Sequence, residues 1–267
     1  MIDDIRQQLT PGMADEQKLN RVREYLQVLS LKVMHDRGDL ARMAFVGGTC
    51  LRIVFNARRF SEDMDFSLIH KTGYDFAELC RNLARDLKLR GIDASVEPKE
   101  GRPVHSTMIK FTGLLKDLGL SPLKGQKLSI KLEIDTNPPA GWRTERTIIN
   151  NQYIFPITHY DLPSLFAGKL HACFYRNYTK GRDFYDLFWY LGKGVKPNLV
   201  LLNNAIKQTQ GASPRITEKN VRSFLHTKID TVDLKAAKKD VERFLEDTSE
   251  LALFDAGLLK NTITKVF

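Results

Sequence analysis

The stretch that decides the fold spans residues 45–66 and reads Phe45-Val-Gly-Gly-Thr-Cys-Leu-Arg-Ile-Val-Phe-Asn-Ala-Arg-Arg-Phe-Ser-Glu-Asp-Met-Asp-Phe66. Its apolar start ends at Gly47 and Gly48, whose missing side chains would let a phosphate lie directly against backbone N–H groups. Residues 49–56 follow as a short predicted helix, and the start of that helix would favour an anion. A Gly-Gly pair after a strand is more often a simple tight turn, but this order of elements predicts a phosphate site.

Two carboxylates follow the predicted helix at alternate positions. Asp63 and Asp65 alternate with Met64 and Phe66, so on a strand both acids would share one face. Neighbouring oxygen ligands suit Mg²⁺, which commonly bridges carboxylates to substrate phosphates. By itself the pair would be typical of a solvated strand surface. Beside the glycine turn it predicts metal-assisted phosphoryl chemistry.

A third carboxylate is expected from residues 127–135, where apolar and polar side chains alternate strictly. If this strand pairs with the strand of Asp65, it brings Glu133 or Asp135 to the metal, with Lys131 nearby to balance the charge. The periodicity does not choose between the two acids. The alternative is a polar strand face with no part in the chemistry.

Composition indicates a folded and basic protein. Of 267 residues 42% are hydrophobic, enough for a sizeable core, and 41 Lys and Arg stand against 32 Asp and Glu, a net charge of +9. That charge would attract polyanions such as RNA, unless it mainly solvates helix surfaces. With no apolar stretch near the roughly 20 residues that span a bilayer and no signal-peptide pattern, we expect a cytoplasmic protein without membrane contact. The three cysteines lack the spacing of a zinc site or a disulfide framework.

The periodicities predict an α+β fold in two domains. Residues 1–160 are expected to form a mixed sheet with flanking helices, and residues 161–267 a helical bundle that completes the active-site cleft. Asp161-Leu-Pro-Ser164 is typical of a helix start, with an N-cap and a proline in the first turn. The helices and strands expected elsewhere are helices at 16–36, 74–90, 198–209, 217–227, 233–245 and 249–259 and strands at 93–96 and 107–111.

A second charged stretch, residues 165–187, contains a lysine helix followed by two aspartates. On a helix Lys169, Cys173 and Arg176 would share one face, and Asp183 and Asp186 would share a face of the next helix. A carboxylate there could accept a proton from an attacking hydroxyl, while Lys169 offsets phosphate charge. The alternative is a set of exposed ion pairs from Lys180 and Arg182 to the aspartates, which would contribute little stability.

These motifs resemble a known enzyme superfamily. Gly47-Gly-Thr-x-Leu-Arg52, followed by Ser61-x-Asp-x-Asp-Phe66, resembles the nucleotidyltransferases of DNA polymerase β type and, more narrowly, the AbiEii/AbiGii toxin family, which includes the MenT toxins. The lysine helix and Lys180-Gly-Arg-Asp-x-x-Asp-Leu187 resemble the C-terminal motifs of that family. The resemblance covers about residues 40–190. This chain has Gly-Gly-Thr where many proteins outside the family have Gly-Ser.

The resemblance implies a Mg²⁺-dependent nucleotidyltransferase toxin, restrained by an antitoxin and associated with phage defence. It would transfer an NMP from an NTP to an acceptor hydroxyl, which for the MenT relatives is the 3′ end of tRNA, and so block translation and growth. Asp63, Asp65 and Glu133 would hold the metal, and Asp186 or Asp183 would act on the acceptor. Residues implied to bind the nucleotide are Gly47, Gly48, Thr49, Arg52, Ser61, Lys131, Lys169 and Arg182. The alternatives are transfer to a small molecule or protein, and a non-catalytic RNA-binding protein.

Overall fold

The computed structural model describes residues 1–123, 125–176, 178–211 and 215–267. The chain forms two compact units. The first unit comprises residues 1–56, 60–138 and 146–159, and the second comprises residues 57–59, 139–145 and 160–267. The short segment 57–59 therefore belongs to the second unit, although the residues on both sides of it belong to the first. Among the helices in the described ranges, none is long and apolar enough to cross a membrane.

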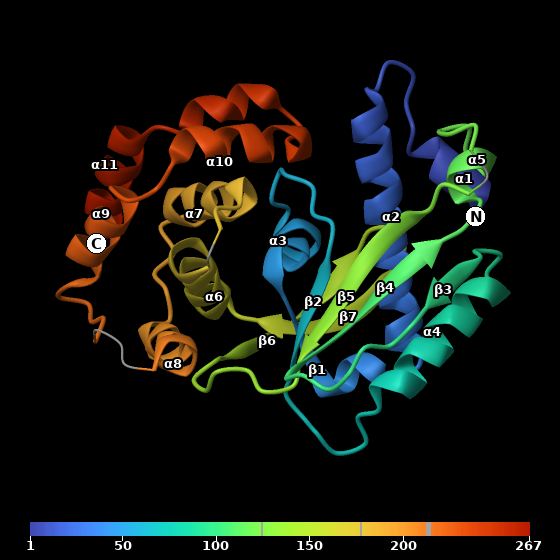
Figure 1. Ribbon diagram of the computed structural model, residues 1–267, viewed down its shortest axis with the longest axis horizontal. Coiled ribbons are helices and arrows are strands. Elements are labelled where there is room, and N and C mark those ends of the chain that lie inside the picture. The colour runs from blue at the N-terminus through green and yellow to red at the C-terminus, as the bar shows by residue number, and fades with distance from the viewer. Residues whose placement is uncertain (124, 177, 212–214) are drawn as a thin grey trace. The chain divides into compact units, whose positions relative to one another are not determined.

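A seven-stranded mixed sheet forms the centre of the first unit (Figure 1), with the strand order β3-β4-β5-β2-β1-β7-β6. β2 is antiparallel to β1 and parallel to β5, and β1 is parallel to β7. The strands are β1 (Met43–Val46), β2 (Met64–Leu68), β3 (Ala94–Val96), β4 (Val104–Phe111), β5 (Leu128–Asp135), β6 (Thr144–Asn150) and β7 (Ile154–Tyr160). The two strands with the predicted carboxylates, β2 and β5, are thus direct neighbours.

Two long helices of the first unit, α2 and α4, pack against each other and against the sheet (Figure 1). α2 buries an apolar face that includes Val22, Leu26 and Leu29, as its periodicity predicts. α4 begins where the Asp75 side chain accepts a hydrogen bond from the backbone of Glu78. The helices of this unit are α1 (Ile2–Gln7), α2 (Asp15–Asp36), the 3₁₀ turn η1 (Asp39–Arg42), α3 (Gly47–Phe55), α4 (Phe76–Leu89) and α5 (Leu114–Asp117).

The second unit is mainly helical. α6 packs against α7 and α8, and α7 also packs against α10. The predicted cap of α6 is confirmed, because the Asp161 side chain accepts a hydrogen bond of 2.9 Å from the backbone of Ser164. Its helices are α6 (Leu162–Tyr175), α7 (Gly181–Gly192), α8 (Leu199–Gln210), α9 (Val221–Ile229), α10 (Leu234–Val241) and α11 (Ala256–Val266), with the 3₁₀ turns η2 (Glu242–Phe244) and η3 (Thr248–Leu253).

The start of α7 lies in close contact with α10. A Cβ atom on Gly181 would lie only 1.9 Å from the backbone oxygen of Ala237, so a side chain at this position would force the two helices apart. The backbone N–H of Gly181 donates to the Asp240 side chain at 2.7 Å. The glycine of the Lys-Gly-Arg-Asp motif therefore has a packing role.

The predicted fold class is confirmed: a mixed sheet with flanking helices is followed in the sequence by further helices. One of the predicted helices is wrong. A single helix over residues 249–259 is replaced by η3 and then α11, because the Asp255 side chain caps a new helix by accepting from the backbone of Leu258. The division into two domains at residue 160 stays a prediction.

Candidate active site

The turn from β1 into α3 lies directly against the carboxylate of Asp65. Gly47 has a φ of +75°, which favours glycine. A Cβ atom at this position would lie 2.2 Å from Oδ2 of Asp65, far inside any allowed contact. Asp65 is the register partner of Val46, the residue before the turn. The first glycine of the motif is therefore required both for the backbone conformation and to leave room for the Asp65 carboxylate.

The parallel pairing of β2 with β5 brings a second carboxylate beside Asp65. Glu133 is the register partner of Asp65, whereas Asp135 is the partner of Ser67. The predicted pairing is confirmed, and its register places Glu133 level with Asp65. Burial raises the pKa of Asp135 more than its hydrogen bond from the backbone of Asn137 lowers it. Of the two acids that the sequence left open, Glu133 is thus the one adjacent to Asp65.

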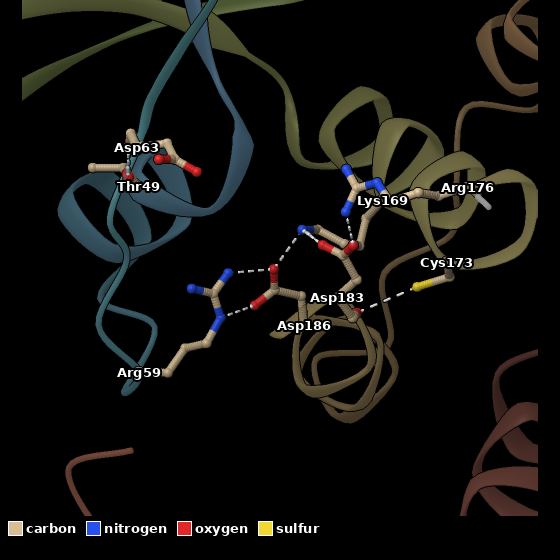
Figure 2. Close-up of polar contacts among 8 residues, drawn as sticks. All are labelled: Thr49, Arg59, Asp63, Lys169, Cys173, Arg176, Asp183 and Asp186. Carbon is tan, nitrogen blue, oxygen red and sulfur yellow. Dashed lines mark hydrogen bonds and ion pairs between the residues drawn. The ribbon is translucent and has the colours of Figure 1, made fainter. Parts of the chain in front are cut away.

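Asp63 directly precedes β2, and α3 holds its backbone. The buried hydroxyl of Thr49 donates a hydrogen bond to the Asp63 carbonyl (Figure 2). Thr49 was predicted to contact phosphate, but in the structure its hydroxyl fixes the segment that carries the first aspartate. The glycine turn and the aspartates, separated by about a dozen residues in sequence, are therefore parts of one local structure.

Lys131 lies among these acids. Its Nζ is 2.8 Å from Oε1 of Glu133. Burial acts to lower the pKa of Lys131, but the carboxylates of Glu133, Asp63 and Asp65 outweigh it and raise that pKa. All three predicted metal ligands are thus close enough to act on one cation. Within the described part of the chain, no three His, Cys, Asp or Glu side chains are grouped tightly enough to hold a metal ion as they stand.

The other predicted nucleotide-binding residues of the first unit contact α2. The Arg52 guanidinium is 3.0 Å from Oε2 of Glu24 and lies 4.7 Å from the centre of the Phe60 ring. The backbone oxygen of Ser61 accepts a hydrogen bond of 3.1 Å from Gln27. α2 therefore supports both α3 and the loop that leads to Asp63.

In the second unit, five charged side chains form what we call the buried ion network: Arg59, Lys169, Arg176, Asp183 and Asp186. Figure 2 shows Lys169 pointing to both aspartates, and its Nζ is 2.7 Å from an oxygen of each. Arg176 is 2.6 Å from the other oxygen of Asp183. Arg59 makes two contacts with Asp186, at 2.7 and 2.6 Å. The predicted common face of Lys169 and Cys173 is confirmed, because both side chains contact Asp183, whereas Arg176 follows the end of α6 in an extended conformation and reaches Asp183 from there.

Burial distinguishes this network from surface ion pairs. The side chains of Arg59 and Asp186 are 2% and 0% exposed, whereas that of Arg176 is 31% exposed. Burial alone would raise the pKa of Asp183, yet Lys169 and Arg176 hold that pKa below its ordinary value. Burial likewise opposes the charge of Lys169, but Asp183 and Asp186 raise its pKa. The alternative of exposed pairs to the aspartates is wrong, because both aspartate side chains are buried. Arg182 lies over the Phe244 ring at 4.2 Å.

Arg59 was not among the predicted site residues. Its partner Asp186 is 127 positions further along the chain, and no local pattern links two such residues. The only signal was the basic loop itself, Arg58 and Arg59, between two motifs that were recognised. A buried arginine cannot be told from a solvated one in a loop whose neighbours carry the same charge.

A comparison with protein families gives a match over most of the chain. Residues 32–258 match the family described as "Nucleotidyl transferase AbiEii toxin, Type IV TA system". No curated protein matches the chain.

One solved structure supports the same fold. A crystal structure of a proposed nucleotidyltransferase from H. pylori is 20% identical, covers 96% of each chain and has a TM-score of 0.55. A crystal structure of JHP933 from Helicobacter pylori is 21% identical, covers 89% of this chain and 92% of that chain, and has a TM-score of 0.47. At these identities the first structure supports the fold alone.

Proposed function

This chain belongs to the AbiEii family of nucleotidyltransferase toxins, and we propose that it transfers an NMP from an NTP to the 3′ hydroxyl of an RNA and releases pyrophosphate, with tRNA as the expected acceptor. The family belongs to type IV toxin–antitoxin systems, so a cognate antitoxin and an NTP substrate follow from membership. Adding a nucleotide to the 3′ end of tRNA in the cytoplasm would block translation and growth. A role in phage defence is part of the same proposal.

One observation carries the proposal: Gly47 leaves the space that Asp65 occupies, and Asp65 is level with Glu133 on the neighbouring strand. We propose that Asp63, Asp65 and Glu133 hold Mg²⁺. The donor set fits a hard cation, because all three donors are carboxylates and all three act on the charge of Lys131. A bound Mg²⁺ would neutralise charge on the phosphates and polarise the reacting phosphoryl group.

The residues of this chain would bind and orient the nucleotide. Backbone N–H groups at Gly47, Gly48 and Thr49, at the start of α3, suit a phosphate because the helix dipole favours an anion there. Arg52 and Lys131 are paired with Glu24 and Glu133, so a phosphate would compete with those carboxylates for the two cations. The backbone oxygen of Ser61 accepts a hydrogen bond from the Gln27 side chain, which holds this residue in place.

The buried ion network supplies the proposed second group of residues. Lys169 is proposed to bind the phosphates together with Arg182 of α7, and one of the aspartates to accept the proton of the attacking hydroxyl. Asp183 suits that role better than Asp186. Its partner Arg176 is 31% exposed, so solvent reaches that end of the network, whereas Asp186 is fully buried against Arg59. The lowered pKa of Asp183 keeps it deprotonated at neutral pH. Substrate would have to displace a partner from the network.

The distribution of charge favours a nucleic-acid acceptor. The second unit has 20 Lys and Arg against 13 Asp and Glu, and so carries +7 of the net charge of +9. A basic helical unit attracts a polyanion before specific contacts form. A small neutral acceptor would gain nothing from this asymmetry. The base of the NTP is set by the shape of the pocket, which a motif does not encode.

The test is an incubation of the purified protein with total tRNA, Mg²⁺ and each α-labelled NTP in turn. We expect label on RNA with at least one NTP, lost in Asp63→Ala and retained in Asp135→Asn, the matched acid beside Ser67. Label in a low-mass product or in protein, and not in RNA, would mean a different acceptor. Growth arrest that survives Asp63→Ala in a folded protein would mean a non-catalytic RNA-binding protein.

A further inference from the structure

One tyrosine of the second unit is unusually exposed. Tyr178, between α6 and α7, is 60% exposed, although its ring is large and mostly apolar. Two cations lie near this ring: the Arg176 guanidinium carbon is 5.4 Å from its centre and Lys180 Nζ is 5.7 Å from it. Cation–π attraction holds the ring in position without burying it. An aromatic face is thus offered to solvent between positive charges.

A second tyrosine nearby repeats the arrangement. Tyr175 is the last residue of α6, and Lys228 of α9 lies 4.5 Å from the centre of its ring. His171, one turn earlier on α6, stacks on Tyr175 with the ring centres 5.5 Å apart and the planes at 15°. Tyr175 and Arg176 are consecutive in sequence, so the two aromatic–cation groups adjoin. We call Tyr175, Arg176, Tyr178, Lys180 and Lys228 the tyrosine–cation surface.

The charges of this surface are only partly neutralised. Arg176 pairs with Asp183 of the buried ion network. Over the described residues, neither Lys180 nor Lys228 forms an ion pair with a carboxylate. Two lysines and two tyrosines therefore remain for a ligand that combines negative charge with flat aromatic groups.

We infer that the tyrosine–cation surface binds single-stranded RNA, with a base stacked on Tyr178 and phosphates near Lys180 and Lys228. The inference rests on the proposed function, in which RNA is the acceptor. Proteins that bind single strands combine cations along the backbone with aromatic rings on which bases stack. Because every base has a flat face, such contacts tolerate many sequences. An acidic peptide would use the lysines and leave the exposed ring without a role.

Binding at this surface makes a distinct kinetic prediction. Loss of a stacking ring should weaken RNA binding and raise the KM for RNA, while the KM for NTP stays unchanged. Loss of a lysine should reduce the salt dependence of RNA binding, because one fewer phosphate is neutralised. Tyr178 is exposed, so its replacement should leave the melting temperature unchanged.

The experiment measures binding of a fluorescent single-stranded RNA by anisotropy at several salt concentrations. We expect Tyr178→Ala to weaken binding about tenfold, Tyr178→Phe to retain it, and Lys228→Ala to lower the salt slope by about 0.7. Lys193→Ala is the matched control, because Lys193 also lies over an aromatic ring, that of Trp189 at 5.8 Å, at the other end of α7.

Four outcomes decide the inference. Equal RNA affinity in wild type and Tyr178→Ala would overturn it, as would polyglutamate binding as tightly as RNA with the same sensitivity to Tyr178→Ala. If wild-type protein labels RNA but Tyr178→Ala leaves the KM for RNA unchanged, this surface is wrong while the proposed function stands. If Tyr178→Ala weakens RNA binding but the label goes to another acceptor, the surface stands and the proposed function is wrong.

Discussion

Arg59 and Asp186 form a bidentate, fully buried ion pair inside the second unit, with Nε–Oδ1 and Nη2–Oδ2 distances of 2.7 and 2.6 Å. Burial alone would lower the pKa of Arg59, but Asp186 raises it, so the guanidinium stays charged. An isolated β-bridge from Arg59 to Leu245 fixes the same segment through its backbone. The pair explains why residues 57–59 belong to the second unit although they lie between motifs of the first.

Removing one member of this pair should destabilise the protein strongly. Arg59→Met leaves Asp186 buried beside Lys169 alone, and Asp186→Leu leaves Arg59 buried without its carboxylate, so each should cost about 3–5 kcal/mol in urea unfolding. The double variant keeps the net charge of the network and should recover most of that loss.

Arg58→Met is the matched control for Arg59→Met. Arg58 pairs with Glu250 at 3.2 Å, but its side chain is 64% exposed, so the loss should be about 1 kcal/mol or less. Equal effects at positions 58 and 59, or a double variant as unstable as the sum of the singles, would show that burial of this pair does not govern stability.

The buried ion network should also set the stability of the protein in acid. The pKa of Asp183 is held below its ordinary value of 3.8, so its contribution is present above that value and is lost as pH falls through the lowered pKa. Lys169→Met removes a partner of Asp183, so the loss of stability in acid should begin at higher pH. Lys193→Met, at the exposed end of α7, should not. Melting temperatures measured from about pH 2 to 5 test both, because this range spans the ordinary pKa of an aspartate and the lowered one.

Gly47→Ala should damage the site through the Asp65 side chain. The new Cβ would lie 2.2 Å from Asp65 Oδ2 at a φ of +75°, so the carboxylate must move and transfer activity should fall at least tenfold. Gly38→Ala is the matched control, because Gly38 has a similar φ of +80° with no atom within 4 Å. It should cost only about 1–2 kcal/mol of stability and leave activity intact. Equal activity in the two variants would contradict this account of Gly47.

The third metal ligand can be identified by paired substitutions. Glu133→Gln, level with Asp65, should weaken Mn²⁺ binding about tenfold or more in a paramagnetic titration, because it removes a charged oxygen donor. Asp135→Asn, level with Ser67, should leave Mn²⁺ binding unchanged. The reverse ranking would assign the role to Asp135.

The sequence predicted best those features that repeat at short range. Strict alternation located β5, and Asp161 with Pro163 located the start of α6, because each signal lies within a few residues of the element that it forms. The face shared by Lys169 and Cys173 followed from helical geometry alone. These predictions needed no knowledge of distant partners.

The sequence could not supply pairings between distant segments. It allowed Glu133 or Asp135 beside Asp65, because alternation places both on one face and only the strand register separates them. It gave no partner for Arg59. It also merged η3 with α11, because the apolar spacing continues across the break and only the Asp255 cap interrupts the helix.

The two aspartates of α7 should differ in what their loss does. Asp183→Asn removes the proposed proton acceptor at the partly exposed end of the network, so turnover should fall about 100-fold or more with NTP affinity retained. Asp186→Asn removes the carboxylate that holds Arg59 and Lys169, so its main effect should be lost stability. Single-turnover transfer on the folded protein, with calorimetric NTP titration, separates turnover from binding. If Asp186→Asn stops turnover without loss of stability while Asp183→Asn retains activity, Asp186 is the proton acceptor, and its contact with Arg59 must open in the substrate complex.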